Sequence, residues 1–171
     1  MNELTIDAVD LPRLTGLAEA LVQTMPRQLV IGMVGTLGAG KTTMTQQIAA
    51  ALGLDPAEVT SPTFNLLSSY RGAQRGQPIE LHHLDAYRLG DEDEFLELGV
   101  EELFEAENSW VIIEWADRVA AVMPPATLWI ELDLHSGAMG DGSTEPDAPA
   151  RLVTMRTDDF DLDQALDELQ A

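Results

Sequence analysis

The sequence contains no cysteine, a single lysine and no long hydrophobic run. The lack of cysteine excludes a disulfide framework, a thiolate metal site and a cysteine nucleophile. No apolar stretch approaches the roughly 20 residues that a membrane-spanning helix needs. The first residues, Met1 to Asp7, show neither a basic segment nor the apolar core of a signal peptide. We therefore expect a cytoplasmic protein that does not associate with membranes.

Basic residues are scarce as well: 9 Lys and Arg stand against 30 Asp and Glu, which gives a net charge of −21. Binding to a nucleic-acid backbone draws its affinity from Lys and Arg that neutralise phosphates. The balance thus argues against direct, unaided binding of nucleic acid. It suits either simple solubility or an acidic face that docks on a basic partner. The length of 171 residues fits one domain, residues 1–171, with a full core.

One stretch carries a strong signal for phosphate binding. Residues 35–43, Gly-Thr-Leu-Gly-Ala-Gly-Lys-Thr-Thr, match the P-loop pattern G-x-x-x-x-G-K-[ST]. Its glycines let backbone N–H groups approach phosphate oxygens. Lys41, the only lysine, is expected along the β- and γ-phosphates, and the Thr42 hydroxyl on Mg²⁺. The predicted nucleotide-binding residues are Gly35, Gly38, Ala39, Gly40, Lys41, Thr42 and Thr43, and the predicted ligands are ATP and Mg²⁺.

The flanking sequence supports this interpretation. Residues 29–34 form a continuous apolar run, as in a central parallel strand, and the apolar residues after the loop recur at helical spacing up to a glycine at position 53. Further strands are expected at 3–9, 63–70, 78–84, 110–115, 128–134 and 151–156, and further helices at 11–25, 90–107, 116–122 and 161–170. These predict an α/β, P-loop NTPase-like three-layer sandwich with a mixed, centrally parallel sheet and antiparallel edge strands.

Three local features refine this prediction. Residues 63–84 read as a β-hairpin with a turn-rich break at 71–76, and the acidic helix at 90–107 breaks at Gly99. The strands at 128–134 and 151–156 are expected to pair antiparallel and form an edge of the sheet. Residues 135–150 are rich in Gly, Asp, Pro and Ser, which predicts a mobile loop.

Two carboxylates are candidates for the Mg²⁺ side of the site, where an acid usually ends a neighbouring apolar strand. Glu114 ends Val-Ile-Ile, and Asp85 ends Leu-His-His-Leu. We assign Glu114 to Mg²⁺, directly or through water, and Asp85 to the attacking water. The reverse assignment stays open. Because the acids end different strands, we expect them to approach the γ-phosphate from different sides.

Thr63 and Trp115 complete the candidate site. Thr63 follows the P-loop helix in a proline-containing turn, where nucleotide switches place a threonine that senses γ-phosphate and Mg²⁺. It is equally consistent with a strand-start threonine. Trp115 is expected either to stack on adenine or to pack in the core. The adjacent His82 and His83 resemble a metal pair, but neighbouring strand residues face opposite ways, which favours ordinary core or surface histidines.

Five segments in series resemble a known family. They are the P-loop, Ser-Pro-Thr-Phe at 61–64, His-Leu-Asp-Ala-Tyr-Arg-Leu at 83–89, Glu-Leu-Gly at 97–99 and Ile-Glu-Trp-Ala-Asp-Arg at 113–118. Their order and spacing over about 10–134 are similar to TsaE (YjeE), the small bacterial P-loop ATPase of tRNA threonylcarbamoyladenosine synthesis. Residues 135–150 form a longer and more acidic loop than is typical of that family.

The resemblance implies both a site and partners. It places the family's P-loop on 35–43, its magnesium threonine on Thr42, its second threonine on Thr63, its motif carboxylates on Asp85 and Glu114, and its Ile-Glu-Trp tryptophan on Trp115. It implies an ATPase that is weak alone and supports the turnover of TsaB and TsaD, of which TsaD transfers the threonylcarbamoyl group, so that tRNA is reached indirectly. One alternative is a small-molecule or nucleotide kinase, which needs a lid with phosphate-clamping arginines; the only long loop, 135–150, contains no Arg or Lys and argues against it. The other alternative is a nucleotide-sensing binding module.

Overall fold

A computed structural model describes residues 1–61, 66–134 and 150–170. Within these residues seven strands form a single sheet in the order β1-β7-β6-β2-β5-β4-β3. The strands are β1 (Asn2–Val9), β2 (Gln28–Gly35), β3 (Leu67–Gln74), β4 (Gln77–Asp85), β5 (Ser109–Glu114), β6 (Thr127–Leu134) and β7 (Arg151–Thr157). The helices are α1 (Leu11–Thr24), α2 (Lys41–Ala51), α3 (Glu92–Glu97), α4 (Val100–Glu105) and α5 (Asp163–Gln170), with 3₁₀ turns η1 (Pro56–Glu58) and η2 (Ala116–Val122).

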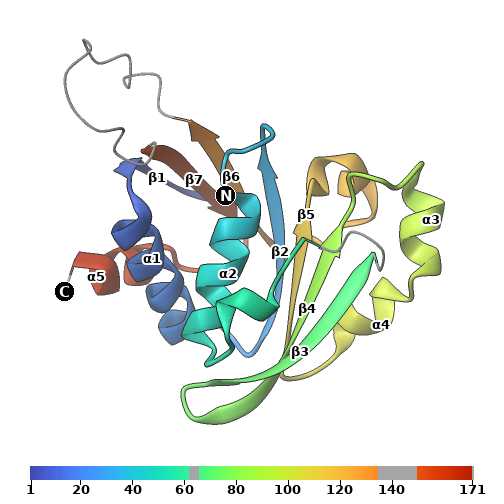
Figure 1. The fold of residues 1–171 in the computed structure, drawn as a ribbon, viewed down its shortest axis with the longest axis horizontal. Helices are drawn as coiled ribbons and strands as arrows, with labels where there is room; N and C mark the ends of the chain where they lie inside the picture. Colours follow the sequence, from blue (N-terminus) through green and yellow to red (C-terminus); the bar gives the residue numbers. More distant parts are fainter. Residues whose placement is uncertain (62–65, 135–149, 171) are drawn as a thin grey trace.

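The sheet is mixed, as predicted. Strands β6, β2, β5 and β4 run parallel, whereas β7, β1 and β3 each pair antiparallel with a neighbour. The strand before the P-loop, β2, lies at the centre of the sheet (Figure 1). The predicted antiparallel pair of β6 and β7 is confirmed, but the expectation that it forms the edge is wrong, because β1 pairs with the outer side of β7 and forms that edge.

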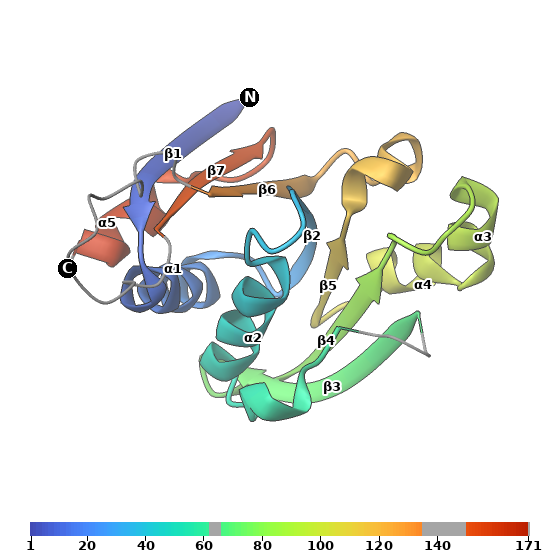
Figure 2. The ribbon, with the colours of Figure 1, turned by 45° about the horizontal axis from the view of Figure 1, so that its top comes forward.

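Helices cover both faces of the sheet, which gives the predicted three layers. Apolar residues of α1, α2 and α5 pack on one face against side chains such as Ile31 and Ile112. Residues of α3, α4 and η2 pack on the other face against Val30, Val111 and Ile113. Figures 1 and 2 show α1 and α2 together on one side of the sheet and α3 and α4 together on the other. Successive side chains of β2 and β5 point to alternate faces, and both faces are covered, so both strands are apolar at every position of the run.

The ends of the helices follow from local chemistry. Asp10 caps α1 by accepting from the Arg13 N–H, with a proline in the first turn. Helix α2 ends before Gly53, which adopts the left-handed conformation expected of a glycine after a helix. Gly99, also left-handed, separates α3 from α4 at the predicted break.

The hairpin of β3 and β4 differs from the prediction in one respect. The predicted break at 71–76 is wrong for its first four residues, because β3 continues to Gln74 and only Arg75 and Gly76, both with positive φ, form the turn. Gly72 has another function: a Cβ there would lie 2.6 Å from the Leu52 carbonyl oxygen. The missing side chain lets the next residue's N–H donate to that same oxygen at 2.8 Å, which attaches β3 to the end of α2.

Several expectations lie partly or wholly beyond the described residues. Thr63 falls within 62–65 and is not described, and the predicted loop at 135–150 is described only at Ala150. The single-domain assignment stays a prediction. The pairing of β1 with β7, which come from distant parts of the chain, agrees with it. None of the helices in the described part of the chain is long and apolar enough to cross a membrane.

The packing at Gly32 generates a testable prediction. This buried β2 glycine lies under the Trp129 ring, and a Cβ there would stand 2.9 Å from the ring and 3.1 Å from the Ala116 Cβ. We expect Gly32→Ala to lower the free energy of unfolding by about 1–3 kcal/mol in urea denaturation, because the core is overpacked. The exposed Gly90, where a Cβ meets nothing closer than 3.5 Å, provides the control Gly90→Ala, which should be nearly neutral. Equal stability of the two variants would contradict this account.

Candidate functional site

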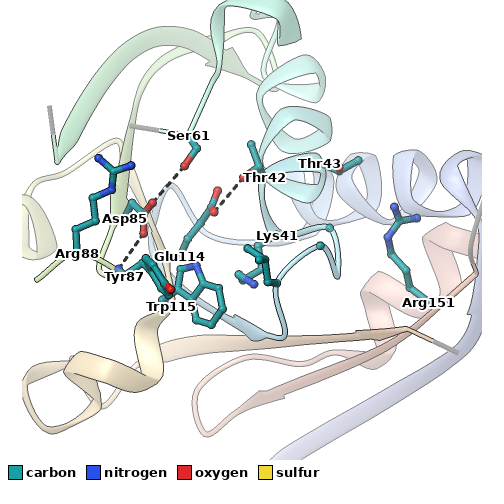
Figure 3. A pocket seen from close by; sticks show the side chains of 13 residues that line it. Lys41, Thr42, Thr43, Ser61, Asp85, Tyr87, Arg88, Glu114, Trp115 and Arg151 are labelled. Carbon is teal, nitrogen blue, oxygen red and sulfur yellow. Dashed lines mark hydrogen bonds between the residues drawn. The ribbon is translucent and has the colours of Figure 1, made fainter. Parts of the chain in front are cut away.

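A cleft of about 480 Å³ opens at the carboxyl ends of the parallel strands, in the size range of small-molecule sites. It is lined by Leu37, Gly38, Gly40, Lys41, Thr42, Thr43, Ser61, Asp85, Tyr87, Arg88, Glu114, Trp115 and Arg151. The side chains from β4, β5 and the start of α2 converge there (Figure 3). Open α/β sheets bind ligands at this edge, so the fold places most of the predicted residues in one site.

The P-loop has the backbone conformation that its glycines predict. Gly35, Gly38 and Gly40 all have positive φ. A Cβ on Gly35 would lie 2.2 Å from the Leu132 carbonyl oxygen, so another residue could not take this conformation here. Gly40 begins α2 without any side-chain cap on the first N–H groups. These N–H groups and the positive end of the helix are thus available to an anion.

Lys41 is held by the loop that precedes it. The residue is 5% exposed, and Nζ donates to the carbonyl oxygens of Gly35 at 2.8 Å and Thr36 at 2.9 Å. The same ammonium lies 3.8 Å from the centroid of the Trp115 ring, a cation–π contact. Burial lowers the pKa of Lys41 below its ordinary value, and nearby carboxylates, Glu114 foremost, act in the opposite direction. The cation is therefore fixed in position but only partly neutralised.

Trp115 has a backbone conformation that is rare for a large residue. It takes φ 58° and ψ 38° directly after β5, and such left-handed positions cluster at functional sites. Its ring lines the cleft, with the Tyr87 ring 4.9 Å away, centroid to centroid. The contact with Lys41 places the indole at the end of the cleft where a P-loop lysine meets the terminal phosphates.

Glu114 is the centre of a buried polar chain. The residue is 3% exposed, and its two oxygens have different partners. The Thr42 hydroxyl donates to Oε2 at 3.0 Å, and His83 Nε2 lies 2.8 Å from Oε1. An ionised carboxylate only accepts, so with Glu114 in that form His83 Nε2 carries the proton of this bond. The arrangement holds a carboxylate and a hydroxyl side by side, two of the oxygen ligands that Mg²⁺ favours.

Asp85 lies beside Glu114 rather than across the site from it. The two residues are paired in register on the parallel strands β4 and β5. The Asp85 carboxylate accepts from the Ser61 hydroxyl at 3.2 Å and from the Tyr87 N–H at 2.9 Å. The two acids are therefore neighbours at the ends of adjacent strands, and the expectation that they approach the γ-phosphate from different sides stays a prediction. The two acids do differ in their partners: among the hydrogen bonds of the described residues, Thr42 donates to Glu114 and not to Asp85.

The charge of the cleft contrasts with that of the whole chain. Two acids, Asp85 and Glu114, and three basic residues, Lys41, Arg88 and Arg151, line it. Three of the nine basic residues thus gather here, although the chain carries −21 overall. This local excess of positive charge, with uncapped helix N–H groups, fits a polyanion such as the phosphates of a nucleotide.

The residues also fit a magnesium ion held mainly by its substrate. No group of three or more His, Asp or Glu side chains in the described ranges forms a metal cage. Mg²⁺ usually binds through one or two carboxylates, phosphates and water instead. Thr42 and Glu114 provide such a set. The adjacent histidines do not form a metal pair: His83 contacts Glu114, whereas His82 contacts Ser69 at 2.7 Å on the strand's other face.

Sequence reasoning gives no role here to several residues that the structure places at the site, among them His83, Tyr87 and Arg151. It favours an ordinary core or surface histidine at His83. One signal was available for His83: it is separated from Asp85 by one residue and so shares its face of the strand. The signal for Arg151 was weaker: it is the first strand residue after a long segment without basic residues. Among the predicted residues, Thr63 lies outside the described part of the chain.

Comparisons with known proteins agree on one family. The model for "Threonylcarbamoyl adenosine biosynthesis protein TsaE" matches residues 10–140. The tRNA threonylcarbamoyladenosine biosynthesis protein TsaE of Treponema pallidum is 37% identical over 116 residues, which are 68% of this chain and 78% of that protein. The protein of the same name from Aquifex aeolicus is 38% identical over 105 residues, which are 60% and 68% of the two chains.

A solved structure shows the same fold. The crystal structure of YdiB from Bacillus subtilis matches 99% of this chain and 95% of its own, with a TM-score of 0.69 and 24% sequence identity. The similarity therefore extends to β7 and α5, beyond the region that the family model matches.

The contact of His83 with Glu114 can be tested without any ligand. We expect a double-mutant cycle of His83→Leu and Glu114→Leu in urea denaturation to give a coupling of roughly 0.5–3 kcal/mol, because either single change leaves a buried polar partner unpaired. The matched control is the same cycle at the adjacent His82, whose side chain lies on the other face of the strand. A His82→Leu and Glu114→Leu cycle should be additive within about 0.5 kcal/mol. Additivity in both cycles would refute the contact.

Proposed function

Because the chain belongs to the TsaE family, we propose that it is a magnesium-dependent ATP hydrolase that serves as an accessory subunit in forming threonylcarbamoyladenosine in tRNA. The observation that carries this proposal is the convergence of a P-loop with a Thr42–Glu114 pair in one cleft. The relatives' names place them in the same modification. The proposal adds to those names a substrate, a metal and a role for each side chain.

ATP binding is supported by the P-loop backbone and the charge of the cleft. The glycines with positive φ add no Cβ to the loop, and Gly40 leaves the first N–H groups of α2 uncapped. Lys41 stands at the loop with two of its three N–H donors on loop carbonyls. Its contact with Trp115, of the kind worth about 0.5–2 kcal/mol, keeps the ammonium at the cleft. We therefore favour an indirect role for Trp115, through Lys41, over stacking on adenine.

Thr42 and Glu114 would hold Mg²⁺, the first through its hydroxyl and the second directly or through water. The ion would neutralise charge on the phosphates. His83 fixes the rotamer of Glu114 by contacting the oxygen that does not accept from Thr42. A fixed carboxylate beside a fixed hydroxyl requires little rearrangement when a metal binds. This is the reason to assign the metal to Glu114 rather than Asp85.

Asp85 would orient or deprotonate the attacking water. It is 8% exposed and lines the cleft, and its oxygens already accept from Ser61 and the Tyr87 backbone. These bonds fix its position while a carboxylate keeps further lone pairs for a water. Thr63 follows Ser61 by two residues, and the family resemblance gives it the role of sensing γ-phosphate and Mg²⁺.

The partners follow from the family resemblance and the charge. We propose that the chain acts with TsaB and TsaD and reaches tRNA only through them. A net charge of −21 opposes direct contact with a phosphate backbone, and it suits docking on proteins with basic surfaces. The transfer of the threonylcarbamoyl group belongs to TsaD in this proposal, and ATP hydrolysis supports the turnover of the assembly.

The division of work between the acids is testable. We expect Glu114→Gln to raise the magnesium concentration needed for half-maximal hydrolysis, because a ligand of the ion loses its charge. Asp85→Asn should retain magnesium-dependent ATP binding while kcat falls by about 10²-fold or more, the pattern of an interaction made in the transition state. Magnesium titrations of phosphate release and of ATP affinity measure both. The opposite pattern would exchange the two roles, and normal turnover in both variants would remove both acids from the site.

The function itself is tested by phosphate release from ATP with and without purified TsaB and TsaD. We expect weak hydrolysis alone and clear stimulation by the pair, and Lys41→Met should abolish both. That variant keeps the length of the stem and removes the ammonium, so circular dichroism should show a folded protein.

The alternatives predict different results in the same assay. A small-molecule or nucleotide kinase would transfer phosphate to one compound in an acceptor panel and ignore TsaB and TsaD. A nucleotide-sensing module would bind TsaB and TsaD in an ATP-dependent manner without any stimulated phosphate release.

A further inference from the structure

Arg151 reaches the P-loop from a part of the sequence beyond the region that the family model matches. It is the first residue of β7, whereas the match ends at residue 140. Its Nε donates to the carbonyl oxygen of Ala39 at 3.0 Å. The arginine and the loop are 112 residues apart in the sequence, so only the pairing of β7 beside β6 brings them together.

The side chain lies directly on the loop at its third glycine. A Cβ on Gly40 would stand 2.5 Å from Arg151 Nε and 3.3 Å from Cδ. Gly40 also has a φ of 109°, a conformation that favours glycine. The close approach of Arg151 and the positive φ both require glycine at position 40, and the absence of a Cβ there leaves room for the guanidinium.

The guanidinium has N–H donors beyond the one that binds Ala39. Of its five N–H groups, one is used by Ala39. Nη1 is buried and has no hydrogen-bond partner in the described part of the chain. A buried charged donor without a partner is costly and uncommon in folded proteins. A ligand oxygen would relieve that cost.

Its place in the cleft indicates which part of a ligand it would meet. Arg151 lines the same cleft as Thr43 but lies on the other side of the loop from Asp85 and Arg88 (Figure 3). The end with Lys41 and the Thr42–Glu114 pair suits the terminal phosphates and the metal. The opposite end would then take the first phosphate, which joins the nucleoside.

We propose that Arg151 is a nucleotide-binding residue that contacts the α-phosphate while its Nε braces the P-loop at Ala39. The inference rests on the proposed binding of ATP. The planar fork of arginine can hold a carbonyl and a phosphate oxygen at once, which a lysine cannot do in the same geometry. Because ATP and ADP share the α-phosphate, Arg151 contributes equally to the binding of both.

The test compares Arg151→Gln with Arg156→Gln on the same strand. Arg156 pairs with Glu131 at 2.8 Å and is not among the residues that line the cleft, so its variant controls for the loss of one positive charge from an acidic protein. We expect Arg151→Gln to weaken ATP and ADP binding by about 10-fold each, measured by calorimetric titration with Mg²⁺. Arg156→Gln should bind both nucleotides as the unmodified chain does.

Two further measurements separate binding from folding and phosphate from nucleoside. The melting temperature without nucleotide should differ little between the variants, and Arg151→Lys, which keeps the charge but not the fork, should show an intermediate affinity. Tripolyphosphate binding should fall with Arg151→Gln as ATP binding does; a loss confined to the nucleotides would move the contact to the nucleoside and overturn the proposal. Unchanged ATP and ADP affinity would overturn it too, as would a loss for ATP alone. If the unmodified chain bound neither nucleotide, the proposed function would fall as well.

Discussion

The parallel pairing of β2, β5 and β4 is the constraint on which the site depends. Parallel strands end at the same edge of a sheet, so the P-loop after β2 and the acids that end β5 and β4 meet without any special connection. The register is strict: Asp85 is opposite Glu114, and Glu114 is opposite Met33, two residues before the P-loop begins. A shift by one residue in β5 would turn Glu114 to the other face and break its contacts with Thr42 and His83.

Basic residues are concentrated in the cleft of a protein whose net charge is strongly negative. With −21 overall, the chain would repel a triphosphate if its basic residues were spread evenly. Instead Lys41 is held by backbone carbonyls and an indole ring, and Arg151 is held by another loop carbonyl. None of these hydrogen bonds is with a carboxylate, so the positive charge is fixed in place and only partly neutralised by the acids nearby. The acidic exterior can then serve solubility or docking while the cleft remains attractive to anions.

The sequence predicts the parts of this protein that depend on local patterns. The P-loop, the apolar strands, the break at Gly99 and the two acids at strand ends all follow from spacing and residue type. The order of the strands does not, because the pairing of β1 with β7 depends on contacts between opposite ends of the chain. Gly72 shows the same limit: within a turn-rich stretch it reads as a turn residue, yet it serves a close approach to Leu52 in the distant helix α2.

The same limit explains why the supporting residues of the site were harder to find than its central ones. Glu114 is recognisable because an acid interrupts an apolar run, but its stability depends on His83 and Thr42 from two other elements. A buried carboxylate without such partners would be strongly unfavourable, and an apolar residue would continue the Val-Ile-Ile run at lower cost. The fold instead surrounds the acid with two donors, one of them the P-loop threonine. An arrangement that places a carboxylate beside the P-loop, where an apolar residue would cost less, is best explained by the chemistry of the cleft.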